Sequence, residues 1–211
     1  MSGAEQSVVG ALTLYKSWTI VRHDMQHPAS KWFRRSLAVV GLSAVAALPL
    51  AAQALPKVGG TAPAAAKLVD VDDRSLSLEA LRGQPVLVVY EDKDSSKLNA
   101  ALKRELDELM KNEPKLRKLR VVAVADVSEY DFWPAKGAVK DAIRDEQKKA
   151  NTTIYLDWSA DFRTKLALDA KTSNVVLFDR EGRFVYARAG ALTAADRKAL
   201  VGEMRALVGG T

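Results

Sequence analysis

The sequence predicts an α/β domain in three layers, with a central mixed sheet that is covered by helices on both faces. Two continuous apolar runs, VLVVY at 86–90 and LRVVAVA at 119–125, have the pattern of strands that are buried on both faces. An amphipathic stretch follows the first run, so strand and helix alternate along the chain. Near the C-terminus, two apolar runs flank a turn at 179–182, which indicates an antiparallel hairpin.

The first half of the domain contains short strands, a buried strand and a long helix. Residues 67–78 predict two short strands joined by a polar turn, and Gly83 ends a helical turn that follows them. A helix is predicted over 95–112, with Asp94 or Ser95 as its N-cap. Its expected inward-facing residues are Leu98, Ala101, Leu102, Leu106, Leu109 and Met110, whereas Lys103, Arg104, Asp107 and Glu108 are expected in solvent.

The second half alternates helix and strand before it closes with the hairpin and a last helix. We expect a mostly polar helix over 134–149, a strand over 152–158 and a short helix over 161–168. Thr193 and Asp196 have the spacing of a capping box, so they predict the start of the final helix. The expected inner face of that helix consists of Leu200, Val201, Met204, Leu207 and Val208.

An N-terminal segment has the layout of a secretory signal. Basic residues are followed by the apolar, small-residue-rich run LAVVGLSAVAALPLAAQA at 37–54, which closes with an A-x-A pattern. We therefore expect a signal peptide over 25–54, cleaved between Ala54 and Leu55. An uncleaved membrane anchor is the alternative, but Pro49 weakens a stretch that is barely long enough to span a bilayer.

The chain thus divides into four parts. Residues 1–24 are either an upstream extension, with Met25 as the true start, or an extended basic region of the signal. Residues 55–66 are rich in glycine and alanine and are expected to be a flexible linker. Residues 67–211 form the folded domain, and the general secretory route is preferred over the twin-arginine route.

Residue usage excludes several kinds of chemistry. Cysteine is absent from the chain, and the only histidines, His23 and His27, lie within the expected leader. The exported protein would therefore lack disulfides, thiol redox chemistry, histidine-activated nucleophiles and zinc sites built from cysteine or histidine. No G-x-G-x-x-G pattern is present, so no nucleotide cofactor is expected.

The charge balance argues against a nucleic-acid partner. The whole chain has a net charge of +6. Five of the 32 basic residues and two of the 26 acidic residues lie in 1–54, so residues 55–211 carry a net charge of only +3. A domain with this balance has no strongly basic surface of the kind that binds phosphate backbones.

The order of elements resembles the thioredoxin-like fold, in particular its exported, peroxiredoxin-related branch. In that branch a strand leads into a Cys-x-x-Cys helix, and a loop with a cis-proline precedes the closing hairpin. The corresponding stretches here are LRGQPVLVVYEDKDSSKLNAALKRELDEL and KTSNVVLFDREGRFVYARAGALT. By this resemblance, Ser95 and Leu98 occupy the two cysteine positions and Ser173 the cis-proline position. The resemblance therefore implies a thioredoxin-like domain without a dithiol.

Three stretches, VVYEDKDSSKLNAAL, IYLDW and TSNVVLFDREGRFVYARAGALTAAD, are similar to the YtfJ family. These are periplasmic, thioredoxin-like proteins of Gram-negative bacteria without an established activity, and the likeness covers residues 55–208. It implies a periplasmic location and an unknown periplasmic protein or peptide as partner. It implies no nucleic acid, and no stable membrane anchor after cleavage.

A candidate ligand site lies at the edge where dithiol relatives carry their redox centre. In the fold that the chain resembles, the turn 92–97 and the loop 172–174 lie side by side. A helix N-terminus there would suit an anion or a peptide carbonyl, and the loop could pair with an extended peptide. Alternatively, these residues only cap a helix and fill a turn. The candidate residues are Asp92, Asp94, Ser95, Ser96, Thr172, Ser173 and Asn174.

Two further groups of side chains are weaker candidates. Asp92, Asp126 and Asp157 follow successive strands, where open α/β sheets bind ligands, and carboxylate oxygens suit Ca²⁺ or Mg²⁺. Acidic residues at strand ends also simply begin polar loops. An aromatic group either lines a ligand groove or packs between elements. It consists of Tyr130, Phe132, Trp133, Tyr155 and Trp158.

The preferred function is therefore that of a redox-inactive binding or adaptor domain in the periplasm, with no catalytic residues and no cofactor. The alternative is an enzyme on the same scaffold, either dependent on carboxylates or a divalent metal, or a cofactor-binding oxidoreductase.

Overall fold

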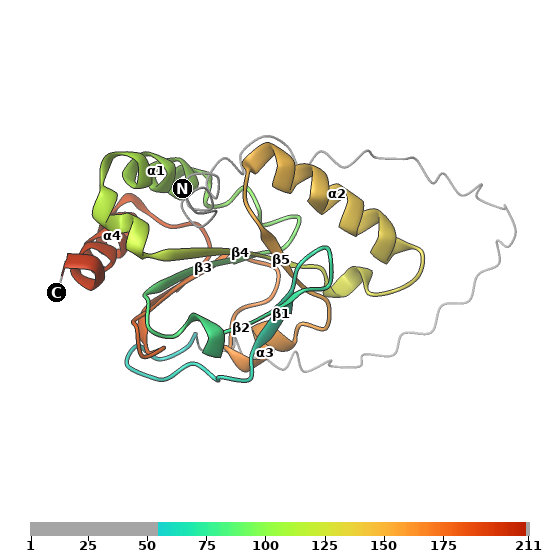
Figure 1. Ribbon diagram of the computed structural model, residues 1–211, viewed down its shortest axis with the longest axis horizontal. Coiled ribbons are helices and arrows are strands. Elements are labelled where there is room, and N and C mark those ends of the chain that lie inside the picture. Colours follow the sequence, from blue (N-terminus) through green and yellow to red (C-terminus); the bar gives the residue numbers. More distant parts are fainter. Residues whose placement is uncertain (1–54, 210–211) are drawn as a thin grey trace, which may run out of the picture.

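The computed structural model describes residues 55–209, so the expected signal peptide over 25–54 lies outside the described residues. The described chain folds into a three-layer α/β domain around one mixed sheet with the strand order β2-β1-β5-β4-β3-β6-β7 (Figure 1). None of its helices combines the length and apolarity needed to cross a membrane. The strands are β1 (Lys67–Val69), β2 (Ser75–Ser77), β3 (Val86–Glu91), β4 (Arg120–Asp126), β5 (Ile154–Asp157), β6 (Asn174–Phe178) and β7 (Phe184–Ala189).

Four α-helices and three short 3-10 helices connect these strands. The α-helices are α1 (Ala100–Asn112), α2 (Ala135–Ala150), α3 (Asp161–Lys165) and α4 (Ala194–Gly209), and the 3-10 helices are η2 (Glu79–Leu81), η3 (Pro114–Lys118) and η4 (Ser128–Tyr130). Strands β3, β4 and β5 are parallel neighbours, whereas β6 is antiparallel to β3 and to β7. The predicted hairpin is confirmed, and Gly182 occupies its turn with a φ of +79° that favours glycine.

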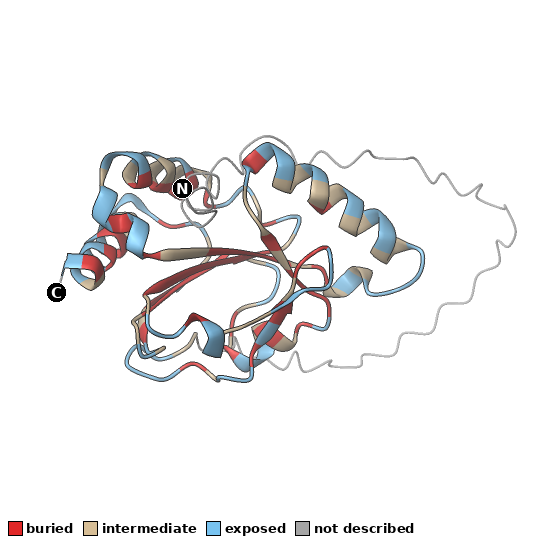
Figure 2. Ribbon diagram, in the orientation of Figure 1, coloured by how far each residue is buried: buried red, intermediate tan, exposed pale blue. Residues whose placement is uncertain are grey.

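The helices cover both faces of the sheet. Helices α1, α4 and α2 lie on one face, and α3 lies on the other (Figure 1). Leu102 and Leu106 of α1 pack with Leu200 and Met204 of α4 in one hydrophobic cluster. On the opposite face, the rings of Tyr90 and Phe162 stack with their centroids 6.1 Å apart. The buried residues follow the central strands (Figure 2), as the continuous apolar runs predicted.

Helix α1 begins five residues later than predicted. Residues 93–99 form consecutive turns, and the first helical residue is Ala100. Asp92 and Ser95 close the first turn reciprocally, because the Ser95 N–H donates to Asp92 Oδ1 at 2.7 Å and the Asp92 N–H donates to Ser95 Oγ at 3.0 Å. The prediction of Asp94 or Ser95 as the helix N-cap was therefore wrong, because Asn99 occupies the N-cap position. Because α1 begins at Ala100, its free N–H groups lie beyond the turn 92–97, where the anion site was predicted.

Two side chains of this region face the opposite way from the prediction. Leu98 was expected to face inward, but it lies before the helix and is 46% exposed. Lys103 was expected in solvent, but it is only 4% exposed because it lies on the inner stripe of α1 with Leu106 and Met110. The Lys103 amino group therefore lies inside the domain, beside Glu91.

The segment 55–66, expected to be a flexible linker, packs against the domain in the structure. The Gly59 N–H donates to the Phe184 carbonyl at 2.7 Å, and the Phe184 N–H donates to the Gly60 carbonyl at 2.9 Å. Ala62 and Ala66 are buried. Their small side chains let the backbone approach the edge of the sheet, so this segment covers the open side of β7.

Candidate functional site

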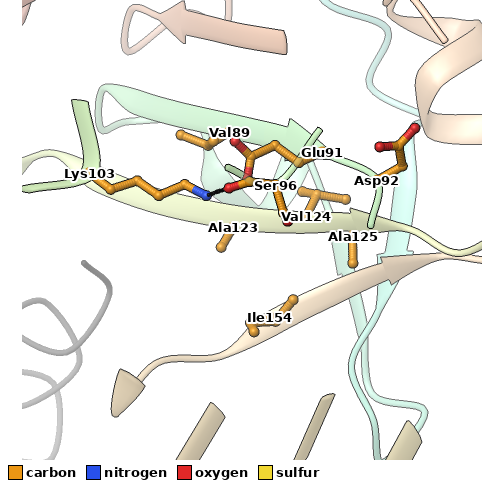
Figure 3. A pocket seen from close by; sticks show the side chains of 9 residues that line it. All are labelled: Val89, Glu91, Asp92, Ser96, Lys103, Ala123, Val124, Ala125 and Ile154. Atoms are coloured by element: carbon orange, nitrogen blue, oxygen red, sulfur yellow. Dashed lines mark hydrogen bonds and ion pairs between the residues drawn. The ribbon is translucent and has the colours of Figure 1, made fainter. Parts of the chain in front are cut away.

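A buried ion pair lies at the carboxyl end of β3. Lys103 Nζ of α1 is 2.5 Å from Glu91 Oε2, and these side chains are 5% and 10% exposed. The ammonium also donates to the Ser96 carbonyl at 2.7 Å, and Ser173 Oγ donates to Glu91 Oε1 at 2.9 Å. Figure 3 shows the Lys103 side chain extended toward Glu91 and Ser96 above β4. The pair thus joins β3, α1 and the loop before β6.

Asn99 extends this arrangement toward the C-terminal part of the chain. Its Nδ2 donates to Ser173 Oγ at 2.8 Å and to the Gly190 carbonyl at 2.9 Å, and its Oδ1 accepts from the Leu192 N–H at 2.8 Å. Both donated hydrogen bonds of the Asn99 amide, and the bond that its oxygen accepts, are therefore made within the protein. We call Glu91, Asn99, Lys103 and Ser173 the buried polar network.

Glu91 is the acidic member of the network. Burial raises the pKa of the Glu91 carboxyl, and the neighbouring Lys103 ammonium and Ser173 hydroxyl oppose that rise. A hollow of about 40 Å³ adjoins the Glu91–Lys103 ion pair, and Ala123, Ala125 and Ile154 line it on one side (Figure 3). This space is large enough for a water molecule to reach the ion pair.

The structure divides the seven candidate ligand-binding residues into two groups. Ser95, Ser173 and Asn174 are 2%, 0% and 0% exposed. Asn174 Nδ2 donates to the carbonyls of Asp169 and Thr172, so it closes the loop. The residues that reach the surface are Asp92, Asp94, Ser96 and Thr172. Ser173 bonds Glu91, the residue just before the turn 92–97, so the loop 172–174 lies beside the start of that turn.

A polar hollow of about 240 Å³ opens at this edge, beyond the carboxyl ends of β3 and β4. Two of its charged pairs are internal: Arg163 Nε lies 3.6 Å from Asp126 Oδ2, and Lys171 Nζ lies 3.7 Å from Glu129 Oε1. The complete lining consists of Asp92, Lys93, Asp94, Asp126, Ser128, Glu129, Tyr130, Arg163 and Lys171.

The three aspartates proposed as weak metal ligands do not converge. Asp126 and Asp157 are paired in register on β4 and β5, but the Asp157 carboxylate is buried and accepts from the Tyr90 hydroxyl at 3.0 Å. Asp126 Oδ1 accepts from the Ser128 N–H and Oγ. Within residues 55–209, no group of three or more acidic side chains is placed to hold a metal ion.

The Tyr90–Asp157 hydrogen bond supports a first prediction. Burial raises the pKa of Asp157, and the Tyr90 hydroxyl opposes that rise. Tyr90→Phe should lower the free energy of unfolding by about 1.5–3 kcal/mol at neutral pH, because a buried carboxylate loses a donor. Urea unfolding measures the loss. Tyr155→Phe, which removes a half-buried hydroxyl elsewhere on β5, is the matched control. Equal effects of the two variants would contradict the prediction.

An apolar groove of about 220 Å³ adjoins the polar hollow. It lies between η4 and the N-terminal half of α2, and Tyr130 lines both spaces. The other lining residues are Lys93, Asp126, Val127, Ala135, Ala138, Val139 and Ala142.

The predicted aromatic group is spread over several environments. Phe132 and Trp133 are 58% and 91% exposed. Trp158 is buried under α2 with Lys136 Nζ 4.6 Å from its ring centre, and Tyr155 packs on the other face of the sheet. Of the five aromatics, only Tyr130 lines the groove.

Solved structures with this architecture include proteins of thiol chemistry. The DsbE protein of Chlorobium tepidum, a proposed thiol:disulfide interchange protein, matches with a TM-score of 0.55 and 18% identity over 72% of this chain and 99% of that one. A proposed protein disulfide isomerase of Bacteroides thetaiotaomicron matches with a TM-score of 0.51 and 18% identity over 73% and 91%. A thiol peroxidase of Chromobacterium violaceum matches with a TM-score of 0.50 and 19% identity over 72% and 88%.

This chain has a thioredoxin-like fold. No protein-family model matches it, and no curated protein does. The thioredoxin-like domain has no cysteine, and at the two positions assigned to cysteines Ser95 is buried and hydrogen-bonded to Asp92, while Leu98 is exposed. This edge therefore carries no thiol for thiol–disulfide exchange.

Sequence reasoning missed most of the buried polar network. Glu91 lies just beyond the apolar run 86–90, and Lys103 is predicted on the solvent face. One signal was available: Asn99, Lys103, Leu106 and Met110 are spaced by four, three and four residues, so they share one stripe of a helix. Two polar residues on an otherwise apolar stripe indicate a buried hydrogen-bonding site.

Proposed function

We propose that this protein is an exported, periplasmic binding or adaptor domain of the YtfJ kind, which holds a partner protein or peptide without thiol chemistry. The sequence pattern of a secretory signal over 25–54 supports the location. The thioredoxin-like fold without cysteine supports a binding role, because a fold specifies no activity by itself and function depends on the residues at the site.

The observation that carries this proposal is the open edge formed by the polar hollow and the apolar groove. Together they offer charged side chains beside an apolar surface, the usual composition of a site that binds part of another molecule. The buried polar network adjoins this edge and joins two of the segments beside it, the end of β3 and the loop before β6. A rigid base favours binding, because little conformational freedom is lost when a partner docks.

Site-specific crosslinking tests this proposal. A photo-crosslinking amino acid is placed at Lys171, which lines the polar hollow with its side chain 81% exposed, in cells that express the full-length gene. The matched control position is Lys198, an exposed residue of α4. We expect one defined adduct from position 171 and none from position 198. The purified partner should then bind the wild-type protein and bind Lys171→Glu at least about tenfold more weakly.

Two results would overturn the proposal. One is the absence of any adduct that is specific to position 171. The other is a rise in melting temperature with Ca²⁺, Mg²⁺ or a flavin that Asp92→Ala abolishes, which would favour the enzyme alternative because only a bound ligand stabilises the native state by mass action.

The absence of thiols leads to a separate prediction. The purified protein should not accelerate the reduction of insulin by dithiothreitol, since the chain contains no thiolate to attack a disulfide. Turbidity measurements with a dithiol thioredoxin as the positive control detect the reaction. Any acceleration above the uncatalysed rate would contradict the prediction.

A further inference from the structure

Two consecutive aromatic side chains project from the loop between η4 and α2. Trp133 is 91% exposed and Phe132 is 58% exposed, and they account for half of the four large apolar residues that are exposed within 55–209. Adjacent exposed aromatics are uncommon on a soluble domain, where such a patch usually marks an interaction site. Within the described chain both side chains face solvent, so they are available to contact another molecule.

The apolar groove beside them has room for such a side chain. Ala135, Ala138 and Ala142 lie at helical spacing on α2, and their small side chains leave the space open. At about 220 Å³ the groove is larger than the roughly 150 Å³ cavity that holds a benzene ring in an engineered protein. The groove is accordingly large enough to receive an aromatic side chain from another molecule.

We propose that the protein forms a two-fold symmetric dimer in which Trp133 of each protomer inserts into the apolar groove of the other. A two-fold interface uses the same patch on both protomers, so each feature of the patch must meet its complement in the partner. A projecting aromatic pair and an apolar groove that begins two residues later meet this requirement. This dimer fills the apolar groove, so a partner of the kind proposed above would contact the polar hollow alone in the dimer and both spaces in the monomer.

Charges at the rim of the groove are also self-complementary. Lys93 lines the groove and the neighbouring Asp94 lines the polar hollow beside it. Neither side chain forms an ion pair with any residue of the described chain. Across a two-fold axis, Lys93 of one protomer can pair with Asp94 of the other, and the same contact forms twice.

The surface available suits a weak dimer. A buried aromatic residue contributes about 150–250 Å². The exposed parts of two Trp133 and two Phe132 side chains, with the two groove surfaces, would therefore bury at most on the order of 1,000 Å² in total, which is at the lower limit for a specific interface. We accordingly expect association at micromolar protein concentrations.

Sedimentation velocity of the protein purified from the full-length gene tests the dimer from low micromolar to several hundred micromolar concentration. The wild type should shift from monomer to dimer with concentration. Trp133→Ala should weaken association by at least about tenfold, the effect of a central aromatic anchor. Ala138→Glu should do the same, because it places a charge in the groove while Ala138 itself is exposed on a helix that tolerates glutamate.

Further variants separate this interface from other contacts. Leu98→Ala, which removes an exposed apolar side chain elsewhere, should leave the dimer unchanged. Lys93→Asp should weaken the dimer by setting two acidic residues against each other, and Lys93→Asp combined with Asp94→Lys should restore it. Urea unfolding confirms that each variant is folded. A wild type that stays monomeric, or a dimer that survives both Trp133→Ala and Ala138→Glu, would overturn the proposal.

Discussion

Replacing Lys103 with methionine should lower the free energy of unfolding by about 3–5 kcal/mol at neutral pH, because it leaves the Glu91 carboxylate buried without its counter-charge. Methionine keeps the length and apolar stem of lysine, so the loss reports the charge rather than a cavity. Urea unfolding followed by circular dichroism measures it. Lys97→Met, at an exposed position in the preceding turn, should change stability by less than about 0.5 kcal/mol.

The pH dependence of this loss has a definite sign. Burial raises the pKa of Glu91 in the folded state above its unfolded value, and removal of the opposing Lys103 ammonium raises that pKa further. A folded state with a raised carboxyl pKa binds more protons than the unfolded state, so its stability falls as the pH rises through the folded pKa. The deficit of Lys103→Met relative to wild type should therefore be smaller at about pH 5 than at about pH 8.

A second substitution separates the charge effect from loss of packing. Glu91→Gln removes the charge and keeps an oxygen that can accept from Ser173 Oγ. Combined with Lys103→Met, it should recover at least half of the lost stability, because a neutral buried site needs no counter-charge. If the double variant is as unstable as Lys103→Met, or if Lys103→Met is as stable as wild type, the ion pair is not what stabilises this junction.

Replacing Asn99 with alanine should lower the free energy of unfolding by about 3 kcal/mol, because it leaves the Leu192 N–H and the Gly190 carbonyl without their partner inside the fold. The same change removes the donor to Ser173 Oγ. Urea unfolding again measures the loss. Asn112→Ala, at the exposed end of α1, is the matched control and should cost less than about 0.5 kcal/mol.

Asn99→Asp provides a pH-dependent version of the same test. A carboxylate at this position would face the Gly190 carbonyl with an acceptor where a donor is required. Burial should raise its folded pKa, so stability should fall as the pH rises through that value. The cost of Asn99→Asp relative to wild type should therefore be larger at about pH 8 than at about pH 5. A cost that does not change with pH would place the side chain in solvent, contrary to the structure.

The contacts of Asn99 and Lys103 show how this edge of the sheet is built without a dithiol. Ser173 occupies the position assigned to the cis-proline, and its hydroxyl links Asn99 to Glu91 instead of presenting a surface for disulfide exchange. The turn that holds the two assigned cysteine positions is closed by Asp92 and Ser95. The junction thus combines hydrogen bonds and one ion pair, and it leaves the neighbouring hollow and groove open at the surface.

The sequence by itself determined the elements whose signals are local. The apolar runs at 86–90 and 119–125, the hairpin turn at Gly182 and the capping box of Thr193 with Asp196 predicted β3, β4, β6–β7 and α4. Each depends on residues within a few positions of one another, so periodicity and turn chemistry suffice. Residue counts alone likewise excluded thiol chemistry, since that conclusion needs no coordinates.

Only the tertiary structure decided the start of α1 and the character of the site. Asn99 bonds residues more than 90 positions away, and Lys103 pairs with Glu91 across the junction between β3 and α1. Such partners compensate for burying polar groups, so they place Lys103 inside although its residue type favours solvent. The same long-range contacts bury Ser173, which local sequence reasoning placed at the surface, because a polar residue is buried only when distant parts of the chain supply its hydrogen bonds.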